Sequence, residues 1–329
     1  MSKRKSILKE IIKENIMLIK EKYKEEKEKI SESLIMIRPE NYKYDETIKK
    51  EEIKKIKEEY KEIKKKMKEK EIEIERIKKN EIKMRENIIC NKWLVITENE
   101  IHILTTKEEK EKEKYIEAIK ELIKRKYKIR NVVNYNYNEK KLEGRESMVI
   151  DKENKTIYCA ISKKTNIEKA IEYAKSTKQK IMIFNTKNRK GKAYEKTNEI
   201  LSIGKEYAII CDEAIINDKM NNKYNILTEL IMQNKKIIII TRKQVEENNC
   251  GSVIEVLNKK KEKKIIMSER AYKGYTERQK KMIEKYGEIV RIKIEEIEKK
   301  GIKVTDIFSE INAEKKKRKK EKLNKHVKA

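Results

Sequence analysis

Residues 148–162 read MVIDKENKTIYCAIS, and this stretch decides the fold. Two runs rich in β-branched and aromatic residues, MVI and TIYCAIS, flank the polar turn DKENK, which is the pattern of a β-hairpin. The following residues predict an amphipathic helix from Ile167 to about Ser176 and then a third strand, KIMIF, at 180–184. The order strand, turn, strand, helix, strand indicates a mixed α/β unit.

Four other stretches repeat this plan, and a recurring supersecondary unit is typical of a repeat fold. The copies are WLVITENEIHIL (93–104) with a helix near 108–126 and VVNYNY (132–137); EILSIGKEYAIICDEAI (199–215) with a helix near 222–234 and KKIIIIT (235–241); SVIEVLNKKKEKKIIMS (252–268) with a helix near 276–286 and EIVRIKI (288–294); and a less complete first copy, SLIMIRP (33–39), a helix near 46–69 and EIEIERI (71–77). The sequence therefore predicts five related units.

The predicted helices each have one apolar face that a sheet must cover. In the helix near 46–69 the apolar side chains Ile53, Ile56, Tyr60, Ile63 and Met67 recur at intervals of three and four residues. A single unit would leave this face in water, so the five units must pack together. We predict a closed five-bladed α/β propeller at 33–311, an N-terminal amphipathic helical extension at 1–32 and a basic C-terminal tail at 312–329.

The charge balance is strongly basic. The 329 residues include 87 Lys and Arg against 58 Asp and Glu, a net charge of +29, while 37% of the residues are hydrophobic. A core can therefore form, but the surplus of positive charge repels itself in a compact state and favours a polyanionic partner. The composition points to nucleic acid as the partner.

Cysteine usage and the N-terminal sequence bear on the cellular environment. Cys90, Cys159, Cys211 and Cys250 are too scattered for a disulfide framework, and none lies in a C-x-x-C pair that would indicate zinc. The first twenty residues carry charges every few positions, which argues against a secretory signal or a membrane span. We expect a reduced, cytoplasmic protein without metal, cofactor or membrane contact, with nuclear import through KKKRKK (315–320) as the alternative.

Several blocks of sequence resemble a known family. The blocks are SLIMIRPENYKYDET (33–47), NKWLVIT (91–97), LEGRESMVIDKENKTIYCAIS (142–162), KTNEILSIGKEYAIICDEAI (196–215) and MSERAYKGYTERQKKMIEKYG (267–287). In this order they are similar to the pentein (guanidino-group-modifying) superfamily, and within it to the amidinotransferase-like hydrolases that use citrulline and arginine. The resemblance covers about residues 33–311 and implies the five-bladed fold that the repeats also predict.

The resemblance also implies where the active site would lie. Such enzymes attack a guanidinium or ureido carbon with a cysteine thiolate, helped by a histidine and by carboxylates that hold the cationic substrate. Glu143 retains the carboxylate of the family's Leu-Glu-Gly segment. Lys196 replaces the histidine, Lys92 stands in the segment that would clasp the substrate, and the nucleophile position falls on or near Thr305.

These replacements predict a degenerate site. A threonine hydroxyl without an adjacent base is a weak nucleophile, and loss of the nucleophile costs about a million-fold in turnover. We expect Lys92 and Lys196 to repel a guanidinium, and Glu143 to accept hydrogen bonds from backbone amides of its own turn. The sequence therefore predicts a pseudoenzyme without a small-molecule substrate; a divergent hydrolase of arginine, citrulline or a derivative is the alternative.

Other residues could carry chemistry in principle. Cys250 in NNCGS could be a relocated nucleophile, but a cysteine beside a turn glycine is more often structural. His102 lies in a predicted strand, where a packed or edge position is the simpler interpretation, and His326 has no evident chemical partner. The stretch AIICDEA has no accompanying phosphate-binding loop, so ATP binding is not expected.

Positive charge gathers in clusters that could contact phosphates, although each cluster alone could equally be a solvated face. Tyr127, Tyr135, Tyr137, Tyr272 and Tyr275 lie within or near them and could stack on unpaired bases or pack at sheet edges. The residues expected to contact phosphates are Lys3, Arg4, Lys5, Lys124, Arg125, Lys126, Lys128, Arg130, Lys187, Arg189, Lys190, Lys192, Lys315, Lys316, Lys317, Arg318, Lys319 and Lys320, with the hairpin at 258–264 as a further cluster.

These clusters favour a structured RNA, and ribosomal RNA with its ribosomal proteins is the commonest such target. We therefore predict a ribosome-associated, non-catalytic factor that occupies a functional site and keeps ribosomes inactive. A protein-only scaffold or a nuclear factor remains a further alternative.

Overall fold

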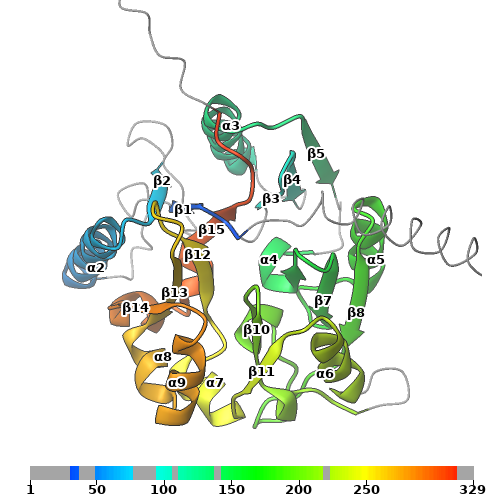
Figure 1. Ribbon diagram of the computed structural model, residues 1–329. Helices are drawn as coiled ribbons and strands as arrows, with labels where there is room; N and C mark the ends of the chain where they lie inside the picture. Colours follow the sequence, from blue (N-terminus) through cyan, green and yellow to red (C-terminus); the bar gives the residue numbers. More distant parts are fainter. Residues whose placement is uncertain are drawn as a thin grey trace, which may run out of the picture.

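The computed structural model describes residues 30–36, 49–76, 94–105, 110–136, 142–217 and 223–316. Within these ranges the strands form three three-stranded sheets and one six-stranded sheet, with helices between the strands along the chain (Figure 1). The predicted extension at 1–32 lies outside the described residues except for 30–32, and so does the tail beyond residue 316.

The segment 148–184 folds as predicted. Strands β6 (Met148–Asp151) and β7 (Thr156–Ala160) form an antiparallel hairpin, helix α5 (Ile167–Ser176) follows, and β8 (Lys180–Phe184) pairs parallel to β7. The Asp151 carboxylate accepts the side-chain amide of Asn154 at 2.8 Å within the polar turn. The side chain of Asn166 accepts the backbone N–H of Lys169 at 3.1 Å and so begins α5.

Three further units have the same antiparallel–parallel pairing, which confirms the predicted repeat. Their elements are β3 (Leu94–Ile96), β4 (Glu100–Thr105), α3 (Lys110–Lys126) and β5 (Asn131–Asn136); β9 (Leu201–Ile203), β10 (Tyr207–Ile210), α6 (Lys223–Met232) and β11 (Lys236–Ile239); and β12 (Ile254–Leu257), β13 (Lys263–Ser268), α8 (Glu269–Gly274), α9 (Glu277–Glu284) and β14 (Glu288–Ile292). The last unit has two helices where one was predicted, because the capping box of Thr276 with Gln279 begins a second helix.

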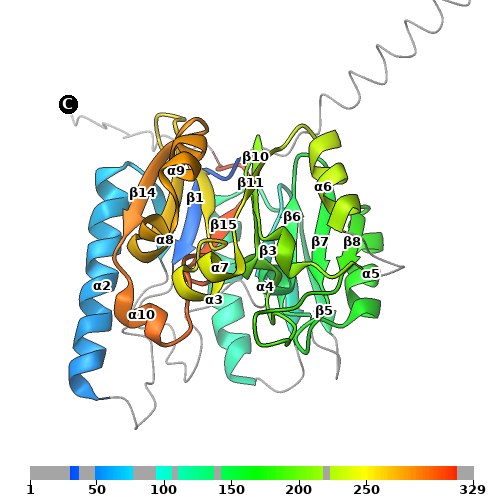
Figure 2. The same ribbon diagram turned by 90° about the horizontal axis from the view of Figure 1, so that it is seen from below.

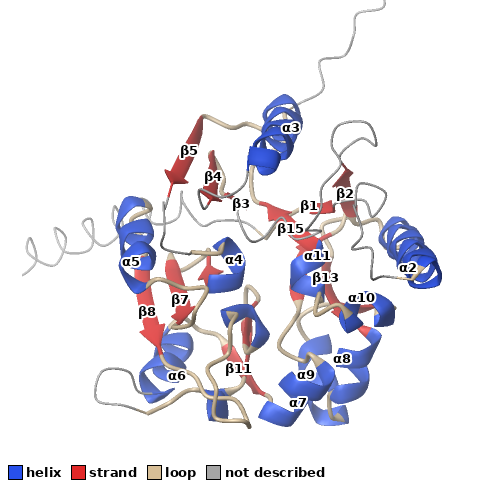
Figure 3. Cartoon of the chain, turned by 180° about the vertical axis from the view of Figure 1, so that it is seen from behind, coloured by secondary structure: helices blue, strands red, loops and turns tan. Residues whose placement is uncertain are grey.

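The first unit is completed by the other end of the chain. Strand β1 (Ser33–Met36), helix α2 (Lys50–Glu69) and β2 (Glu73–Arg76) supply only part of the pattern. Strand β15 (Phe308–Ile311) pairs antiparallel to β1, and its Ile311 also pairs with Ile96 of β3. One six-stranded sheet results, in the order β2-β1-β15-β3-β4-β5, and Figure 3 shows β15 beside β1.

The helices lie on the outside and turn their apolar faces inward. Figure 1 shows α2, α3, α5, α6 and α9 at the periphery, around the strands, and Figure 2 shows α2 and α5 on opposite sides of the molecule. On α2 the side chains of Ile56, Tyr60, Ile63 and Met67 are buried, as the spacing predicts, whereas Ile53 is half-buried. Full burial of such a side chain contributes about 1.5–3 kcal/mol, so this face fixes α2 to its sheet.

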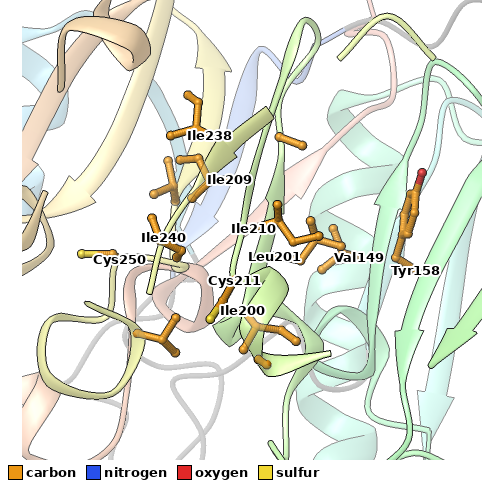
Figure 4. Packing of buried hydrophobic residues seen from close by; sticks show 14 of the residues in the cluster. Val149, Tyr158, Ile200, Leu201, Ile209, Ile210, Cys211, Ile238, Ile240 and Cys250 are labelled. Carbon is orange, nitrogen blue, oxygen red and sulfur yellow. The ribbon is translucent and has the colours of Figure 1, made fainter. Parts of the chain in front are cut away.

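Apolar clusters connect neighbouring units. The largest cluster combines Val149 and Tyr158 of the third unit with Leu201 and Ile210 of the fourth and Met267 of the fifth. Figure 4 shows this packing, with Cys211 and Cys250 among the aliphatic side chains. Because these residues share one core, the units stabilise one another.

Short helical segments precede the first strand of several units, and the sequence did not predict them. They include α4 (Gly144–Ser147) before β6, the 3₁₀ segment η3 (Thr197–Glu199) before β9, and α11 (Val304–Ile307) before β15. Two more lie before β12 and before α11, namely α7 (Arg242–Asn248) and α10 (Glu295–Lys299), whereas the 3₁₀ segment η4 (Asp212–Ala214) lies between β10 and α6. Among the described residues, no helix combines the length and apolar character needed to cross a membrane.

Candidate functional site

The segments α4, η3 and α11 meet at one end of the strands that follow them. The hydroxyl of Thr197 in η3 donates to the backbone carbonyl of Ser147 in α4 at 2.6 Å and accepts the backbone N–H of Ala160 at 2.8 Å. A salt bridge of 2.8 Å between Lys303 Nζ and Glu199 Oε1 connects the start of α11 to η3. Three family positions, Glu143, Lys196 and Thr305, are thereby brought to one site.

Lys196 is the centre of this site. Its ammonium lies 2.9 Å from Asp306 Oδ2 and 3.1 Å from Glu146 Oε1, and only 8% of its side chain is exposed. Both carboxylate side chains are fully buried. Asp306 Oδ2 also accepts the backbone N–H of Lys303 at 2.9 Å. Lys196, at the start of η3, therefore connects η3 to α4 and α11.

The protonation state of Lys196 follows from these neighbours. Burial by itself would lower the pKa of Lys196, but the charges of Asp306 and Glu146 outweigh it and raise this pKa well above its ordinary value. An ammonium that stays protonated cannot act as a general base at neutral pH. The prediction that Lys196 repels a guanidinium needs correction. The charge of Lys196 is offset by the carboxylates of Asp306 and Glu146, and Lys196 pairs with the groups that could otherwise bind a cation.

Thr305 is buried and tied to the unit beside it. Its hydroxyl lies 2.8 Å from the hydroxyl of Ser252, and its backbone N–H donates to the same Ser252 oxygen at 3.1 Å. Only 8% of Thr305 is exposed. The residue that the resemblance implies for the nucleophile therefore has its hydroxyl within a hydrogen-bonded pair.

Glu143 lies at the start of α4, but its predicted role is wrong. Its backbone N–H donates to the Ser147 hydroxyl at 2.9 Å, while no described backbone amide donates to its carboxylate. Oε2 of Glu143 is 3.8 Å from Lys164 Nζ, which is a loose ion pair. The amides of the turn donate to backbone carbonyls instead, that of Gly144 to Leu142 and those of Glu146 and Ser147 to Glu143. Lys92, the fourth family position, lies outside the described residues.

A second charged cluster continues from the site along the first strands of the units. Glu310 of β15 accepts Lys152 Nζ at 2.6 Å on Oε1 and forms an ion pair with Arg145 through Oε2. Lys152 also donates to Asn312 Oδ1 at 2.6 Å and to Ser31 Oγ at 3.0 Å. Burial would raise the pKa of Glu310, but Arg145 and Lys152 lower it to about 2.

The space around this cluster is small. Two cavities of about 50 and 40 Å³ share Arg145, Ile203, Glu255 and Glu310 in their lining. A water molecule occupies about 30 Å³ of liquid, so each cavity has room for few waters, and ligand pockets are typically about 300–1,000 Å³. Burial raises the pKa of the Glu255 carboxyl here. Among the described residues, this interior is filled by the protein's own charged side chains.

The sequence missed most of this arrangement. Glu146 and Asp306 lie three and one residues after the family positions Glu143 and Thr305, and Arg145 directly follows Gly144. Their closeness in sequence to those positions was the only feature of the sequence that could have predicted their place in the site. Their pairing partners come from distant segments, which no local pattern reveals.

The cysteine and histidine alternatives do not form a catalytic pair in the described structure. Cys250 is buried, its thiol is 3.4 Å from the carbonyl of Ala271, and burial raises its pKa to about 12 (Figure 4). His102 is packed in β4, between β3 and β5, with Nε2 2.9 Å from Glu100 and Nδ1 2.8 Å from the Tyr173 hydroxyl. Burial lowers the pKa of His102. His326 lies outside the described residues.

No described group of three or more His, Cys, Asp and Glu side chains has the arrangement of a metal site.

The predicted basic residues are in different electrostatic situations. Lys126 pairs with Glu75, Lys128 with Glu314 and Lys315 with Glu73. Arg189 pairs with Glu246 and Glu247, at 2.8 and 2.9 Å. Residues Lys3, Arg4, Lys5, Lys317, Arg318, Lys319 and Lys320 lie outside the described residues.

The hairpin cluster at 258–264 is largely neutralised by glutamates. Its ion pairs are Lys260 with Glu71, Lys261 with Glu32, Lys263 with Glu206, and Lys264 with Glu262 and Glu288.

The tyrosines mostly pack inside the protein. Tyr127 and Tyr275 are 1% and 3% exposed, so the interpretation that they stack on bases is wrong for these two. The ring of Tyr135 lies edge-on against Tyr173, and the ring of Tyr272 is covered by Lys280 and Arg291. Tyr137 lies outside the described residues.

Solved structures with a similar fold identify the fold class. The N-terminal domain of ArgZ, an arginine dihydrolase from the ornithine–ammonia cycle in Cyanobacteria, matches with a TM-score of 0.62 at 12% identity, covering 86% of this chain and 98% of that one. AgrE in complex with L-arginine matches with a TM-score of 0.63 at 10% identity, covering 88% of this chain and 41% of that one. SxtG, an amidinotransferase of saxitoxin biosynthesis from Microseira wollei, matches with a TM-score of 0.62 at 10% identity, covering 87% and 95%.

The mixed α/β fold is therefore that of pentein-type, guanidino-group-modifying enzymes over most of the chain. The chain belongs to the family described as N,N dimethylarginine dimethylhydrolase, eukaryotic, whose model matches residues 37–303. No curated protein matches the sequence.

Proposed function

We propose that this chain is a five-bladed pentein-fold protein that lacks the family's hydrolytic activity and binds structured RNA. One observation carries the first part: the ammonium of Lys196 lies between the buried carboxylates of Asp306 and Glu146. In that position a neutral imidazole could accept a proton, whereas a paired ammonium cannot. The hydroxyl of Thr305 lies 2.8 Å from the hydroxyl of Ser252, and a hydroxyl is a weaker nucleophile than a thiolate.

Arg145 supports the same proposal. Its guanidinium forms an ion pair with Glu310 and lines both small cavities. The interior of the site thus already holds the guanidinium of Arg145 and the ammonium groups of Lys152 and Lys196. A guanidino substrate would have to displace these cations from buried carboxylates, and removal of one partner of a buried ion pair costs about 3–5 kcal/mol.

The test of this part is an activity assay. We expect no citrulline, ornithine, urea or ammonia when the purified protein is incubated with dimethylarginine, arginine or citrulline, with an active family member as positive control. The variant Thr305→Ala serves as the matched control for contamination. Turnover in the wild type that disappears in Thr305→Ala would contradict the proposal.

The second candidate is a divergent hydrolase, and family membership favours it. The family is described by its action on N,N-dimethylarginine, and the fold matches that of an arginine dihydrolase. In this alternative Glu143, whose carboxylate is only loosely paired with Lys164, is the residue that would bind a guanidinium. Turnover lost in Glu143→Gln and retained in Lys164→Gln would support it.

The proposed RNA binding is supported by charge. The net charge is +29, and the part of the chain that the structure describes includes exposed basic side chains that form no ion pair with other described residues, among them Lys124, Arg125, Arg130 and Lys316. The partner we propose is ribosomal RNA together with ribosomal proteins. In that role the protein would occupy a functional site and keep the particle inactive in the cytoplasm or, through KKKRKK (315–320), in the nucleus.

Salt dependence tests this part. If about eight phosphates are contacted, co-sedimentation with purified ribosomes should weaken with salt, with a log–log slope of about −6 to −7. The cause is that cations released from RNA on binding are less easily released at high salt. A flat salt response, or no co-sedimentation at low ionic strength, would contradict RNA binding.

A further inference from the structure

Two basic clusters that are far apart in the sequence lie side by side in the structure. The backbone N–H of Lys128 donates to the carbonyl of Glu314, and that of Lys316 donates to the carbonyl of Lys126, both at 2.8 Å. Tyr127 and Lys315 form an antiparallel bridge between these bonds. Residues 314–316 are therefore attached to the C-terminal end of α3, and part of the predicted tail is an ordered β-like segment.

The attachment rests on a buried anchor. Tyr127 is 1% exposed, and its hydroxyl donates to Glu75 Oε1 at 3.0 Å. Glu75 is itself 3% exposed and also pairs with Lys126. Since β2 holds Glu75, the position of residues 314–316 is fixed by the first unit as well as by α3.

Charges within the attached segment divide into two groups. Lys126, Lys128 and Lys315 are paired with Glu75, Glu314 and Glu73. The remaining cations are exposed and form no ion pair with a described residue; they are Lys124, Arg125, Arg130 and Lys316. Lys316 Nζ donates to the backbone carbonyl of Lys124 at 2.6 Å, which holds these two residues together.

We propose that Lys124, Arg125, Arg130 and Lys316 form one surface, the α3–tail surface, that binds the phosphate backbone of RNA. This inference rests on the proposed RNA binding and assigns it to a place. Both arginines can bond a phosphate through two N–H groups. The sequence continues from Lys316 directly into four more basic residues, Lys317–Lys320, which adds positive charge to the same segment.

Two other basic clusters have more of their positive charge paired with glutamates or lack a free arginine. The hairpin cluster is largely paired with glutamates. The cluster at 187–192 retains Lys187, Lys190 and Lys192, but its only arginine is held by Glu246 and Glu247 of α7. Figure 1 shows α3 and α7 at opposite ends of the molecule, so the two surfaces can be changed independently.

The test uses two variants with the same change in net charge. One is Lys124→Gln/Arg125→Gln/Lys316→Gln, and the control is Lys187→Gln/Lys190→Gln/Lys192→Gln. The probe is purified ribosomal RNA, titrated at several salt concentrations, with thermal unfolding of each variant as the check on folding. We expect the first variant to reduce the magnitude of the log–log slope by about 2–3, because each lost contact removes about 0.7–0.9, and the control to keep the wild-type slope.

Three other outcomes would contradict the proposal. An equal loss in both variants would overturn the α3–tail surface, because net charge alone would then govern binding. No binding of RNA by the wild type would contradict the proposed function itself. Binding to phosphatidylserine vesicles in preference to RNA would overturn the choice of partner. If the first variant unfolds, Arg125→Gln/Arg130→Gln against Lys190→Gln/Lys192→Gln repeats the comparison without changing the Lys316–Lys124 contact.

Discussion

Replacement of Lys196 by methionine is expected to lower the free energy of unfolding by about 3–5 kcal/mol, the usual cost of removing one partner from a buried ion pair. Asp306 and Glu146 would then lie fully buried without their cation. The measurement is denaturant unfolding at neutral pH, compared between wild type and Lys196→Met.

Two controls separate this effect from a general one. Lys190→Met changes an exposed lysine and should alter stability by no more than about 0.5 kcal/mol. In Lys196→Met/Glu146→Gln/Asp306→Asn the orphaned charges are removed, so part of the lost stability should return. If Lys196→Met is as stable as the wild type, the ion cluster does not hold α4, η3 and α11 together.

Glu310→Gln should cause a loss of similar size, because Arg145 and Lys152 would lose the carboxylate that they share. The effect is pH-dependent. The pKa of Glu310 is lowered to about 2 in the folded state from an ordinary value of 4.5, so its ionised form stabilises the fold. A shift of this size corresponds to about 3 kcal/mol, which is fully present above about pH 4.5 and is lost as the pH falls towards 2.

The measurement compares wild type and Glu310→Gln across this pH range. The difference in unfolding free energy between the two should be largest at pH 5–7 and should shrink between pH 4.5 and 2. The exposed Glu284→Gln is the matched control and should remain close to the wild type throughout. A difference that does not change with pH would show that Glu310 is not ionised within this cluster.

The sequence contained most of the fold. The sequence predicts the hairpins and the apolar face of α2 because turn chemistry and periodicity are local properties. The hairpin turns are DKENK, ENE and GKE, and the apolar face is formed by Ile56, Tyr60, Ile63 and Met67. Strand β15 was not predicted, because FSEI is a short run that forms a strand only beside β1 and β3. The short segments α4, η3 and α11 were missed because four residues or fewer carry no periodicity.

The candidate site was predicted in part. The resemblance located Glu143, Lys196 and Thr305, and the structure brings all three to one end of the strands. The sequence did not reveal that Lys196 pairs with Asp306 and Glu146, because residues 146, 196 and 306 become neighbours only when three units pack. For the same reason the pairing of Lys128 with Glu314 and the burial of Tyr127 were not foreseen.

The pairing of β1 with β15 affects how the protein folds during its synthesis. Ser33 pairs with Ile311, so almost the whole chain must leave the site of synthesis before the first unit gains its third strand. Contacts between such distant segments form slowly, since a long loop must close first. A chain released before Phe308 would leave β1 unpaired on the edge opposite β2, and such unpaired edges promote aggregation. Incomplete copies of this protein should therefore be recognisable by their insolubility.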